Sequence, residues 1–432
     1  MPLTGWQLGI IPSGGGSGQF QVFNVLNYGA TGNGTTDDTT AIQSAINACQ
    51  TAGGGVVFFP PGTYKITAGL TISADNIQIV GSGWSSQILA SGAISGYMLT
   101  VNAPGGGAFR YGILIADIFF NGASIAALNG LDIQTTYSAK IDHVRIRFVF
   151  GIAIHMDGSS GNTGAYNSII ACHITDGGAG VGVQTDFSEW LTIFGGLFSF
   201  YNSAGGIAVR IQNLNCRLIG VGIDNNDTGV RLEFAGRCTI IGCQFDRGQT
   251  QFIYMHGTQY CTVVGNSFNT FNGVASGQGA INVTDTNNAG NIITSNTLKG
   301  GSTWPNFILE HGTVGTPANL YEANDVGAAP VVLISGIARD NIGLNPVGSV
   351  TPPAFPGTTV AQVNNSGYDI VAYIANGTSA ITVIQIAGVG GTYVTTGMQI
   401  AASGWAAIPL KAGEGIKFTY AAGTPTWTWM AD

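Results

Sequence analysis

Six eight-residue segments of this chain align without gaps, and this repetition constrains the fold more than any single motif. Their third, fourth and eighth positions are almost always apolar, and their fifth position is small. The segments begin at Asn167, Leu191, Cys216, Cys238, Cys261 and Asn291, which lie 22 to 30 residues apart. Repeats of this length are typical of solenoids, in which each coil buries its apolar face only against its neighbours.

A second kind of segment recurs beside the first and alternates inward apolar with outward polar residues. Its copies begin at Gly130, Gly151, Gly180, Gly206, Gly229, Phe252 and Ala280. Period-two alternation indicates β-strands. We therefore predict an all-β fold, in which the body of the chain is one parallel β-helix. The aligned repeats leave no room for a second core.

The composition excludes several classes of protein. Charged residues make up 8% of the chain, against about 25% in a typical protein, so long charged helices are excluded. The 45% hydrophobic content excludes disorder, and the net charge of −8 argues against a nucleic-acid partner. No apolar run is long enough to span a membrane, and the start, Met1 to Trp6, lacks the features of a secretory signal. We expect neither membrane insertion nor Sec export.

Glycine and proline clusters predict the boundaries of four segments. Residues 1–18 form an arm that ends in a Gly/Ser linker, and 19–345 form the solenoid. Residues 346–357 form a linker. It contains Pro346, Pro352, Pro353 and Pro356, which have no backbone N–H to donate to a sheet. Residues 358–432 form a small β-sandwich-like domain.

One helix is predicted near the start of the solenoid. Thr36 or Asp37 can cap it, and Gly53 ends it. Its apolar face consists of Ala41, Ile42, Ala45, Ile46 and Cys49. The open end of a solenoid exposes unpaired backbone, so we expect this helix to be a cap. Asp37 and Asp38 are then residues of the helix start rather than catalytic acids.

With the coils in place, the sequence resembles the pectate-lyase superfamily. The resemblance is carried by the stretch from Tyr28 to Ile46 and by the Gly-Gly-Gly-Val-Val-Phe-Phe-Pro-Pro-Gly-Thr-Tyr run that ends at Tyr64. With the coils, it covers about residues 20 to 340. It implies a right-handed parallel β-helix and a polysaccharide lyase, a glycoside hydrolase or a phage tailspike. Asn33 stands where the family usually has Asp. The C-terminal domain looks like modules of phage tail proteins.

Three acidic residues near the coil turns are the first candidate catalytic group. Asp224 and Asp246 occupy the same position of consecutive coils, about 4.8 Å apart, and Asp227 follows in the same turn. Carboxylates this close repel, which raises a pKa as a general acid requires. Sugar hydrolysis uses two carboxyl groups. The alternatives are a solvated turn or a bound calcium ion. We call these three residues the acidic turn.

The second candidate group lies on the outward face of the alternating strands. On that face Glu233 is the alternative candidate for the general acid, and Arg210 could act as the base of a lyase. A salt-bridge ladder is the alternative. The residues expected to bind substrate are Arg210, Arg231, Tyr254, His256 and Trp190. Other aromatic candidates are Trp84, Phe200, Tyr201 and Trp304.

Cysteine and histidine patterns favour no metal centre. Cys216, Cys238 and Cys261 align at the first coil position, which predicts a thiol ladder in which one adjacent pair could bridge. Their spacing is one coil rather than a chelating loop, and the five histidines form no HExxH motif. We therefore expect no cofactor, apart from the calcium alternative.

The leading functional prediction is a phage-type tailspike that binds and hydrolyses a bacterial surface polysaccharide. The alternatives are a non-catalytic virion fibre and a polysaccharide lyase or epimerase. The resemblance implies a location in the virion tail, or otherwise outside the cell, and a homotrimer. The last coil of a solenoid exposes its apolar core and requires a cap. We expect the C-terminal domain, through Trp405, Trp427 and Trp429, to cap this coil and to form the contacts between subunits.

Overall fold

The fold is described from a computed structural model. It describes residues 21–431 except for 93, 103–108, 159–163, 249, 270–278, 285–286, 300–305, 312–314, 316, 326–330, 333–335, 340, 342–348, 351, 367–368, 377–379 and 422–424. The predicted arm and linker at 1–18 therefore lie outside the described residues, and so do Trp304 and Pro346.

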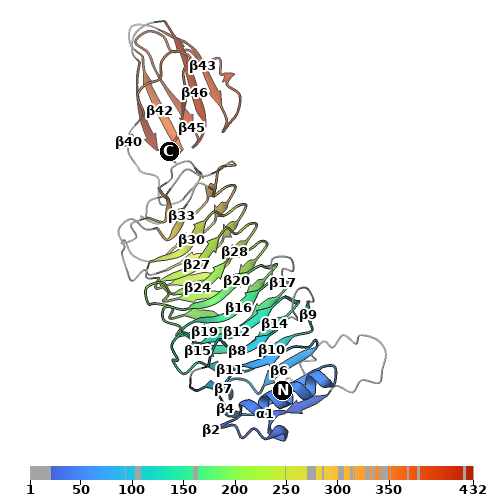
Figure 1. The fold of residues 1–432 in the computed structure, drawn as a ribbon. Helices are drawn as coiled ribbons and strands as arrows, with labels where there is room; N and C mark the ends of the chain where they lie inside the picture. The colour runs from blue at the N-terminus through green and yellow to red at the C-terminus, as the bar shows by residue number, and fades with distance from the viewer. Residues whose placement is uncertain are drawn as a thin grey trace, which may run out of the picture.

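Three long parallel sheets wind around one apolar core, as predicted, and form an elongated solenoid (Figure 1). The first sheet, of 13 strands, contains β1 (Val22–Asn24), β3 (Gly55–Phe59), β6 (Ile77–Gly81), β10 (Leu114–Ala116), β14 (Lys140–Asp142), β18 (Ser168–Ile170), β22 (Thr192–Phe194), β25 (Arg217–Ile219), β28 (Thr239–Ile241), β31 (Thr262–Val264), β34 (Ile292–Thr294), β37 (Leu320–Glu322) and β39 (Ile337–Arg339). The second, of 11 strands, contains β2 (Asn33–Asp37), β4 (Gly62–Ile66), β7 (Ser86–Ala90), β11 (Phe119–Asn121), β15 (Arg145–Arg147), β19 (His173–Thr175), β23 (Leu197–Ser199), β26 (Gly222–Asp224), β29 (Gln244–Asp246), β32 (Ser267–Phe268) and β35 (Thr297–Leu298).

The third sheet, also of 11 strands, carries the site discussed below. It contains β5 (Leu70–Ile72), β8 (Tyr97–Val101), β12 (Asn129–Gln134), β16 (Ile152–Asp157), β20 (Val181–Asp186), β24 (Ile207–Ile211), β27 (Thr228–Glu233), β30 (Gln251–His256), β33 (Ile281–Thr284), β36 (Ile308–Glu310) and β38 (Val331–Val332). A short fourth sheet at the next corner contains β9 (Arg110–Tyr111), β13 (Thr136–Tyr137), β17 (Gly164–Ala165) and β21 (Ser188–Glu189).

The small residue of each aligned repeat turns the chain from the first sheet to the second. Gly195, Gly220, Gly242 and Gly265 all have φ between 62° and 64°, and Ser295 has φ 55° at the same position. This left-handed conformation is easiest for glycine, which has no Cβ. The repeat pattern therefore reflects a backbone requirement at one corner of every coil.

The predicted helix is α1 (Thr39–Thr51), which follows the short 3-10 helix η1 (Val25–Tyr28). It packs against η1 and the first strands, and it covers the N-terminal end of the solenoid (Figure 1). Ile42, Ala45, Ile46 and Cys49 are buried on it, as the apolar pattern predicts. The N-cap residue is Asp38 rather than Thr36 or Asp37. The carboxylate of Asp37 accepts a hydrogen bond from the Thr39 amide (3.0 Å) and so still contacts the first residue of the helix.

Ladders of identical side chains fill parts of the core. Asn266, Asn296, Asn324 and Asn341 form one such ladder, in which each amide nitrogen donates to the next amide oxygen at 2.9 Å. This arrangement satisfies polar groups that would otherwise be costly to bury. All six cysteines are buried and free, so the aligned thiols form no bridge.

The C-terminal part consists of two four-stranded antiparallel sheets around a separate apolar core. The strands are β40 (Ser349–Val350), β41 (Ala361–Val363), β42 (Ile370–Ala375), β43 (Ile381–Ala387), β44 (Val394–Thr395), β45 (Trp405–Leu410), β46 (Gly415–Tyr420) and β47 (Thr426–Ala431). Trp427 and Trp429 lie in this core, whereas Trp405 is 76% exposed. Of the three tryptophans expected to form an interface, only Trp405 is therefore free to contact a partner.

Candidate functional site

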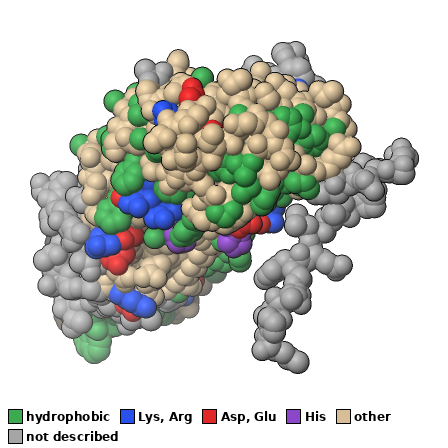
Figure 2. Space-filling model, turned by 90° about the horizontal axis from the view of Figure 1, so that it is seen from below, with side chains coloured by type: hydrophobic (Ala, Val, Ile, Leu, Met, Phe, Trp, Pro, Cys, Tyr) green, Lys and Arg blue, Asp and Glu red, His purple; other side chains and the backbone are tan. Residues whose placement is uncertain are grey.

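On the face that Figure 2 shows, charged side chains are sparse and gather in a few places. The outward face of the third sheet carries several ion pairs. The alternating pattern predicts an outward ladder on this face, in which Gln134 would pair with His155, and Arg210 with Glu233. The side is correct, but these two pairs have the wrong register. Gln134 is the register partner of Asp157, and His155 is the partner of Asp132. Arg210 is the partner of Arg231, and Glu233 is the partner of His256.

His155, on β16, joins carboxylates from the two neighbouring coils. Its Nδ1 lies 2.9 Å from Oδ1 of Asp132 on β12, and its Nε2 lies 2.9 Å from Oδ2 of Asp186 on β20. The ring of Tyr97, on β8, is stacked parallel to the imidazole at a centroid distance of 5.9 Å, and its hydroxyl lies 3.1 Å from Nδ1. Four successive strands therefore contribute to one cluster, which we call the His155 cluster.

The amides of the same face support the carboxylates. Gln134 Nε2 donates to Asp132 at 2.6 Å, and Gln184 Nε2 donates to Asp186 at 2.7 Å. His155 is 14% exposed, Asp132 is 6% exposed and Asp186 is 29% exposed at the side chain. The cluster is thus largely desolvated but open at Asp186, where a ligand could reach it.

The surroundings move the pKa values of this cluster in different directions. Burial alone would lower the pKa of His155, but its hydrogen bonds to Asp132 and Asp186 outweigh burial and raise the pKa to about 9. The hydrogen bond from His155 lowers the pKa of Asp186. Burial, together with the charges of Asp132 and Asp186, raises the pKa of Asp157. At neutral pH His155 is therefore a cation that stabilises an ionised Asp186.

Glu233, the predicted fallback acid, is held as a carboxylate between two arginines. Nη2 of Arg210 lies 2.7 Å from Oε2, and Nη2 of Arg231 lies 2.5 Å from Oε1. Burial would raise the pKa of Glu233, but the hydrogen bonds from both arginines lower it. A general acid must carry a proton near the working pH. This arrangement suits the predicted alternative, a salt-bridge ladder, better than an acid.

Tyr254 and His256 continue the same face on β30. The guanidinium of Arg231 lies over the Tyr254 ring at 4.9 Å, and the rings of Tyr254 and His256 are stacked at 6.2 Å. His256 Nδ1 also lies 3.3 Å from Oγ1 of Thr284. The predicted binding residues Arg210, Arg231, Tyr254 and His256 therefore lie together, one to three coils beyond the His155 cluster.

The acidic turn is arranged differently from the predicted carboxylate triad. Asp224 and Asp246 are register partners, as expected. However, Arg247 forms an ion pair with Asp224, with Nε 2.7 Å from Oδ1. Asp227 accepts hydrogen bonds from the Gly205 amide (2.8 Å) and from the Thr250 hydroxyl. The Asp224 carboxylate is thus neutralised by Arg247, and the Asp227 carboxylate links the segments that contain Gly205 and Thr250.

Trp190 belongs to a strip of rings at the corner that follows the third sheet. Its ring is stacked on that of Tyr166 at 5.7 Å, and Tyr166 contacts Tyr137 at 5.2 Å. Tyr111 and Phe109 extend the strip to the earlier coils. The exposed fraction ranges from 37% for Trp190 to 51% for Tyr166 among four of these rings, and Phe109 is half-buried. We call these five residues the aromatic strip; its Trp190 follows Asp186 by four residues.

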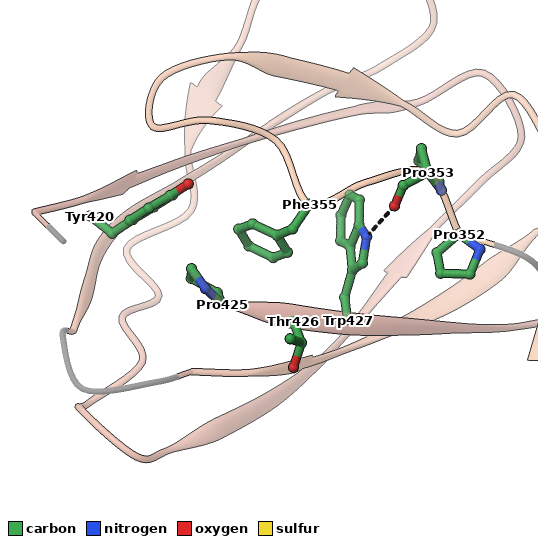
Figure 3. A pocket seen from close by; sticks show the side chains of 7 residues that line it. All are labelled: Pro352, Pro353, Phe355, Tyr420, Pro425, Thr426 and Trp427. Atoms are coloured by element: carbon green, nitrogen blue, oxygen red, sulfur yellow. Dashed lines mark hydrogen bonds between the residues drawn. The ribbon is translucent and has the colours of Figure 1, made fainter. Parts of the chain in front are cut away.

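The remaining aromatic candidates differ in accessibility. Tyr201 is buried and unavailable to a ligand, whereas Phe200 and Trp84 are exposed. A separate cavity of about 350 Å³ lies in the C-terminal sandwich, where Phe355, Tyr420 and Trp427 meet prolines (Figure 3). Trp427 Nε1 donates to the Pro353 carbonyl (2.9 Å), and the Tyr420 hydroxyl donates to that of Pro356 (2.9 Å). The described residues that line this cavity include no carboxylate and no histidine, so they do not favour hydrolytic chemistry.

Across the described ranges, no three His, Cys, Asp or Glu side chains are grouped so that they could hold a metal ion. Within the same ranges, no helix is long and apolar enough to cross a membrane.

Asp132, Asp157, Asp186 and Tyr97 are the members of this site that the sequence analysis missed. The signal that could have found them is the alternation itself. Asp157 occupies an outward position of the strand that carries His155, and Asp132 and Asp186 occupy outward positions of the strands before and after it. The strand that carries Tyr97 precedes the first of the aligned copies, so no repeat pointed to it.

Comparisons with known proteins agree with this architecture. The family model described as rhamnogalacturonase A/epimerase, pectate lyase-like, matches residues 22–251. Mannuronan C5-epimerase AlgE3 of Azotobacter vinelandii is 45% identical over 74 residues, which are 16% of this chain and only 4% of that protein.

Two solved structures are similar to the chain at low identity, and the first of them shares its fold. DFA-IIIase from Arthrobacter chlorophenolicus A6 is 14% identical with a TM-score of 0.54, over 74% of this chain and 86% of that one. ORF18 of Geobacillus virus E2 is 19% identical with a TM-score of 0.49, over 94% of this chain and 76% of that one. With the family model covering more than half of its length, the chain belongs to the pectate-lyase-like family of rhamnogalacturonase A and epimerases.

Proposed function

We propose that the chain hydrolyses a polysaccharide at the His155 cluster, with Asp157 as the general acid and Asp186 as the ionised partner. The observation that carries the proposal is the opposite displacement of two pKa values on register partners, raised for Asp157 and lowered for Asp186. Pairs of carboxyl groups whose surroundings separate their pKa values have this division of roles in glycosidases.

Each group would have a defined task in the reaction. Asp157 gives its proton to the oxygen of the scissile glycosidic bond as that bond breaks. Asp186 either attacks the anomeric carbon or takes a proton from the attacking water. The positive charge of His155 keeps Asp186 ionised, so His155 is a positioning residue. The two register positions are about 4.8 Å apart along the solenoid.

The surroundings offer contacts for a polymer on both sides of this pair. The aromatic strip exposes ring faces at the neighbouring corner, and sugar rings pack well on such faces. Arg210, Arg231, Tyr254 and His256 lie on the following coils, where Glu233 orients both arginines. We assign these four residues and Trp190 to substrate binding.

A lyase or epimerase is the second candidate, favoured by the contact between the Tyr97 hydroxyl and His155. Those reactions remove a proton from carbon and need a base. Burial and nearby carboxylates raise the pKa of Tyr97, and His155 holds a proton up to about pH 9. Both groups are therefore poor bases at neutral pH. A lyase at this site would gain activity as the pH rises through 9.

The test is incubation of the full chain with purified capsular, O-antigen and uronate polymers. Hydrolysis predicts new reducing ends without absorbance in the near ultraviolet, whereas a lyase produces unsaturated ends that absorb there. A protein that binds a polymer and never shortens it would instead be a recognition fibre. Wild-type cleavage that survives both Asp157→Asn and Asp186→Asn would move the site away from this cluster.

A more specific proposal is that the chain is a tailspike of a phage virion, which acts on a bacterial surface polysaccharide and assembles as a homotrimer. It is supported by the resemblance of the C-terminal domain to phage tail modules and by the exposed Trp405 on that domain. Light scattering on the purified chain tests the assembly. A monomer of 44.4 kDa at micromolar concentration would contradict it.

A further inference from the structure

The second sheet carries a cluster of aromatic and cationic side chains that the proposed reaction does not use. Trp84 lies in the turn between β6 and β7, and its Nε1 donates to the carbonyl of His143 at 3.2 Å. The indole therefore reaches across the surface of later coils. Its ring contacts the His173 ring at a centroid distance of 4.9 Å, and it is 42% exposed.

Arg145, on β15, lies beside the same indole. Its guanidinium carbon is 4.9 Å from the centroid of the Trp84 ring and 5.1 Å from that of Phe119. Stacking on rings orients a guanidinium but leaves its five N–H donors available. Within the described part of the chain, no ion pair or side-chain hydrogen bond joins Arg145 to another residue.

The nearby carboxylates contact other side chains. Asp176 accepts from Nε of Arg147 (2.6 Å) and from the Thr175 hydroxyl (2.7 Å). Asp142 pairs with Lys140 (2.6 Å) and with His143 (2.7 Å). Among the described residues, Arg145 is thus a cation without an ion-pair partner, in a chain whose net charge is −8. A partly desolvated guanidinium of this kind favours an anionic ligand with planar oxygens.

We propose that Trp84 and Arg145 form a second, non-catalytic carbohydrate site on the second sheet, which takes a sugar residue that bears a carboxylate. The indole offers a flat apolar face for the sugar ring, and the guanidinium donates two parallel hydrogen bonds to the carboxylate. This inference rests on the proposed function in one respect, since it assumes a polysaccharide ligand. It places acidic sugars on a face separate from the His155 cluster.

Arg145→Lys is the decisive variant, because it keeps the charge but removes the planar fork. Arg147→Lys is the matched control, because Arg147 lies on the same strand and already has Asp176 as its partner. Binding is measured by calorimetry in an Asp157→Asn background, so that cleavage does not alter the ligand. The probes are oligogalacturonates, sulfated oligosaccharides of similar length and neutral malto-oligosaccharides.

We expect Arg145→Lys to weaken oligogalacturonate binding about tenfold or more, while Arg147→Lys changes it less than about twofold. Trp84→Phe should weaken it as well, with an unchanged circular dichroism spectrum. Equal affinity in Arg145→Lys and its parent protein would overturn the proposal. So would a parent protein that binds no oligogalacturonate or that prefers the sulfated probe.

The outcomes separate this inference from the proposed hydrolysis. Wild-type cleavage that depends on Asp157, with no effect of Arg145→Lys on binding, would leave the hydrolysis intact and remove the second site. Binding that depends on Arg145, in a wild-type protein that cleaves no polymer, would support the second site and contradict the proposed hydrolysis.

Discussion

Asp157 and Asp186 are register partners on β16 and β20, and their carboxyl groups have pKa values displaced in opposite directions. Two causes produce the difference: burial raises the pKa of Asp157, whereas the hydrogen bond from His155 lowers that of Asp186. Adjacent coils thus pair two carboxyl groups of different acidity in one register.

Replacing Asp157 by Asn should abolish most of the cleavage. Loss of a general acid costs about 100-fold to 10,000-fold in rate, whereas the amide preserves the shape of the half-buried side chain. The measurement is the rate of reducing-end formation on a proven substrate. Asp117→Asn is the matched control, since Asp117 is exposed in a turn with φ 51°, which Asn adopts readily.

The acidic turn provides a competing prediction. If the reaction takes place at the His155 cluster, the Asp246→Asn and Asp224→Asn variants should retain cleavage within about threefold, because surface changes rarely disturb a distant site. A loss of 100-fold or more in either variant would return the catalytic role to the residues that the sequence alone suggested.

The pH dependence of cleavage should be bell-shaped, with an acidic optimum. Asp186 must be ionised and its pKa lies below 3.8, whereas Asp157 must be protonated and its pKa lies above 3.8. Activity therefore falls at low pH as Asp186 gains a proton and at higher pH as Asp157 loses one. A rate that increases steadily up to pH 9 would point to a lyase.

His155 should also make stability depend on pH. Its pKa in the folded chain, about 9, is raised from 6.5. The stabilisation is then complete below about pH 6.5 and is lost as the pH rises through 9. In thermal melts, the difference in Tm between wild type and His155→Gln should be largest near pH 6 and should shrink by pH 9.5. A difference that is constant across this range would contradict the ion pairs.

Glu233→Gln should lower the free energy of unfolding and leave kcat nearly unchanged. The change leaves Arg210 and Arg231 without their carboxylate, which costs about 1–3 kcal/mol at a site this buried. Urea denaturation monitored by circular dichroism measures the loss. Because Glu233 orients both arginines, KM should rise while kcat changes little; a fall in kcat alone would restore Glu233 as the acid.

The amino-acid sequence determined the solenoid, its first helix and the face on which each polar residue lies. The reason is that apolar alternation has a period of two, and a coil corner with positive φ demands a small residue such as Gly242. Both signals are local, so they can be read from the chain without knowing its neighbours.

Only the tertiary structure decided which side chains meet across coils. A shift of two residues between strands leaves every side chain on the same face, so the pattern could not distinguish Asp132 from Gln134 as the partner of His155. The lengths of the intervening turns set that register. The same holds for Arg247, which lies in a turn outside the alternating strands and yet neutralises Asp224 on the neighbouring coil. Charge partners of this kind arise from spatial stacking, which the sequence pattern does not encode.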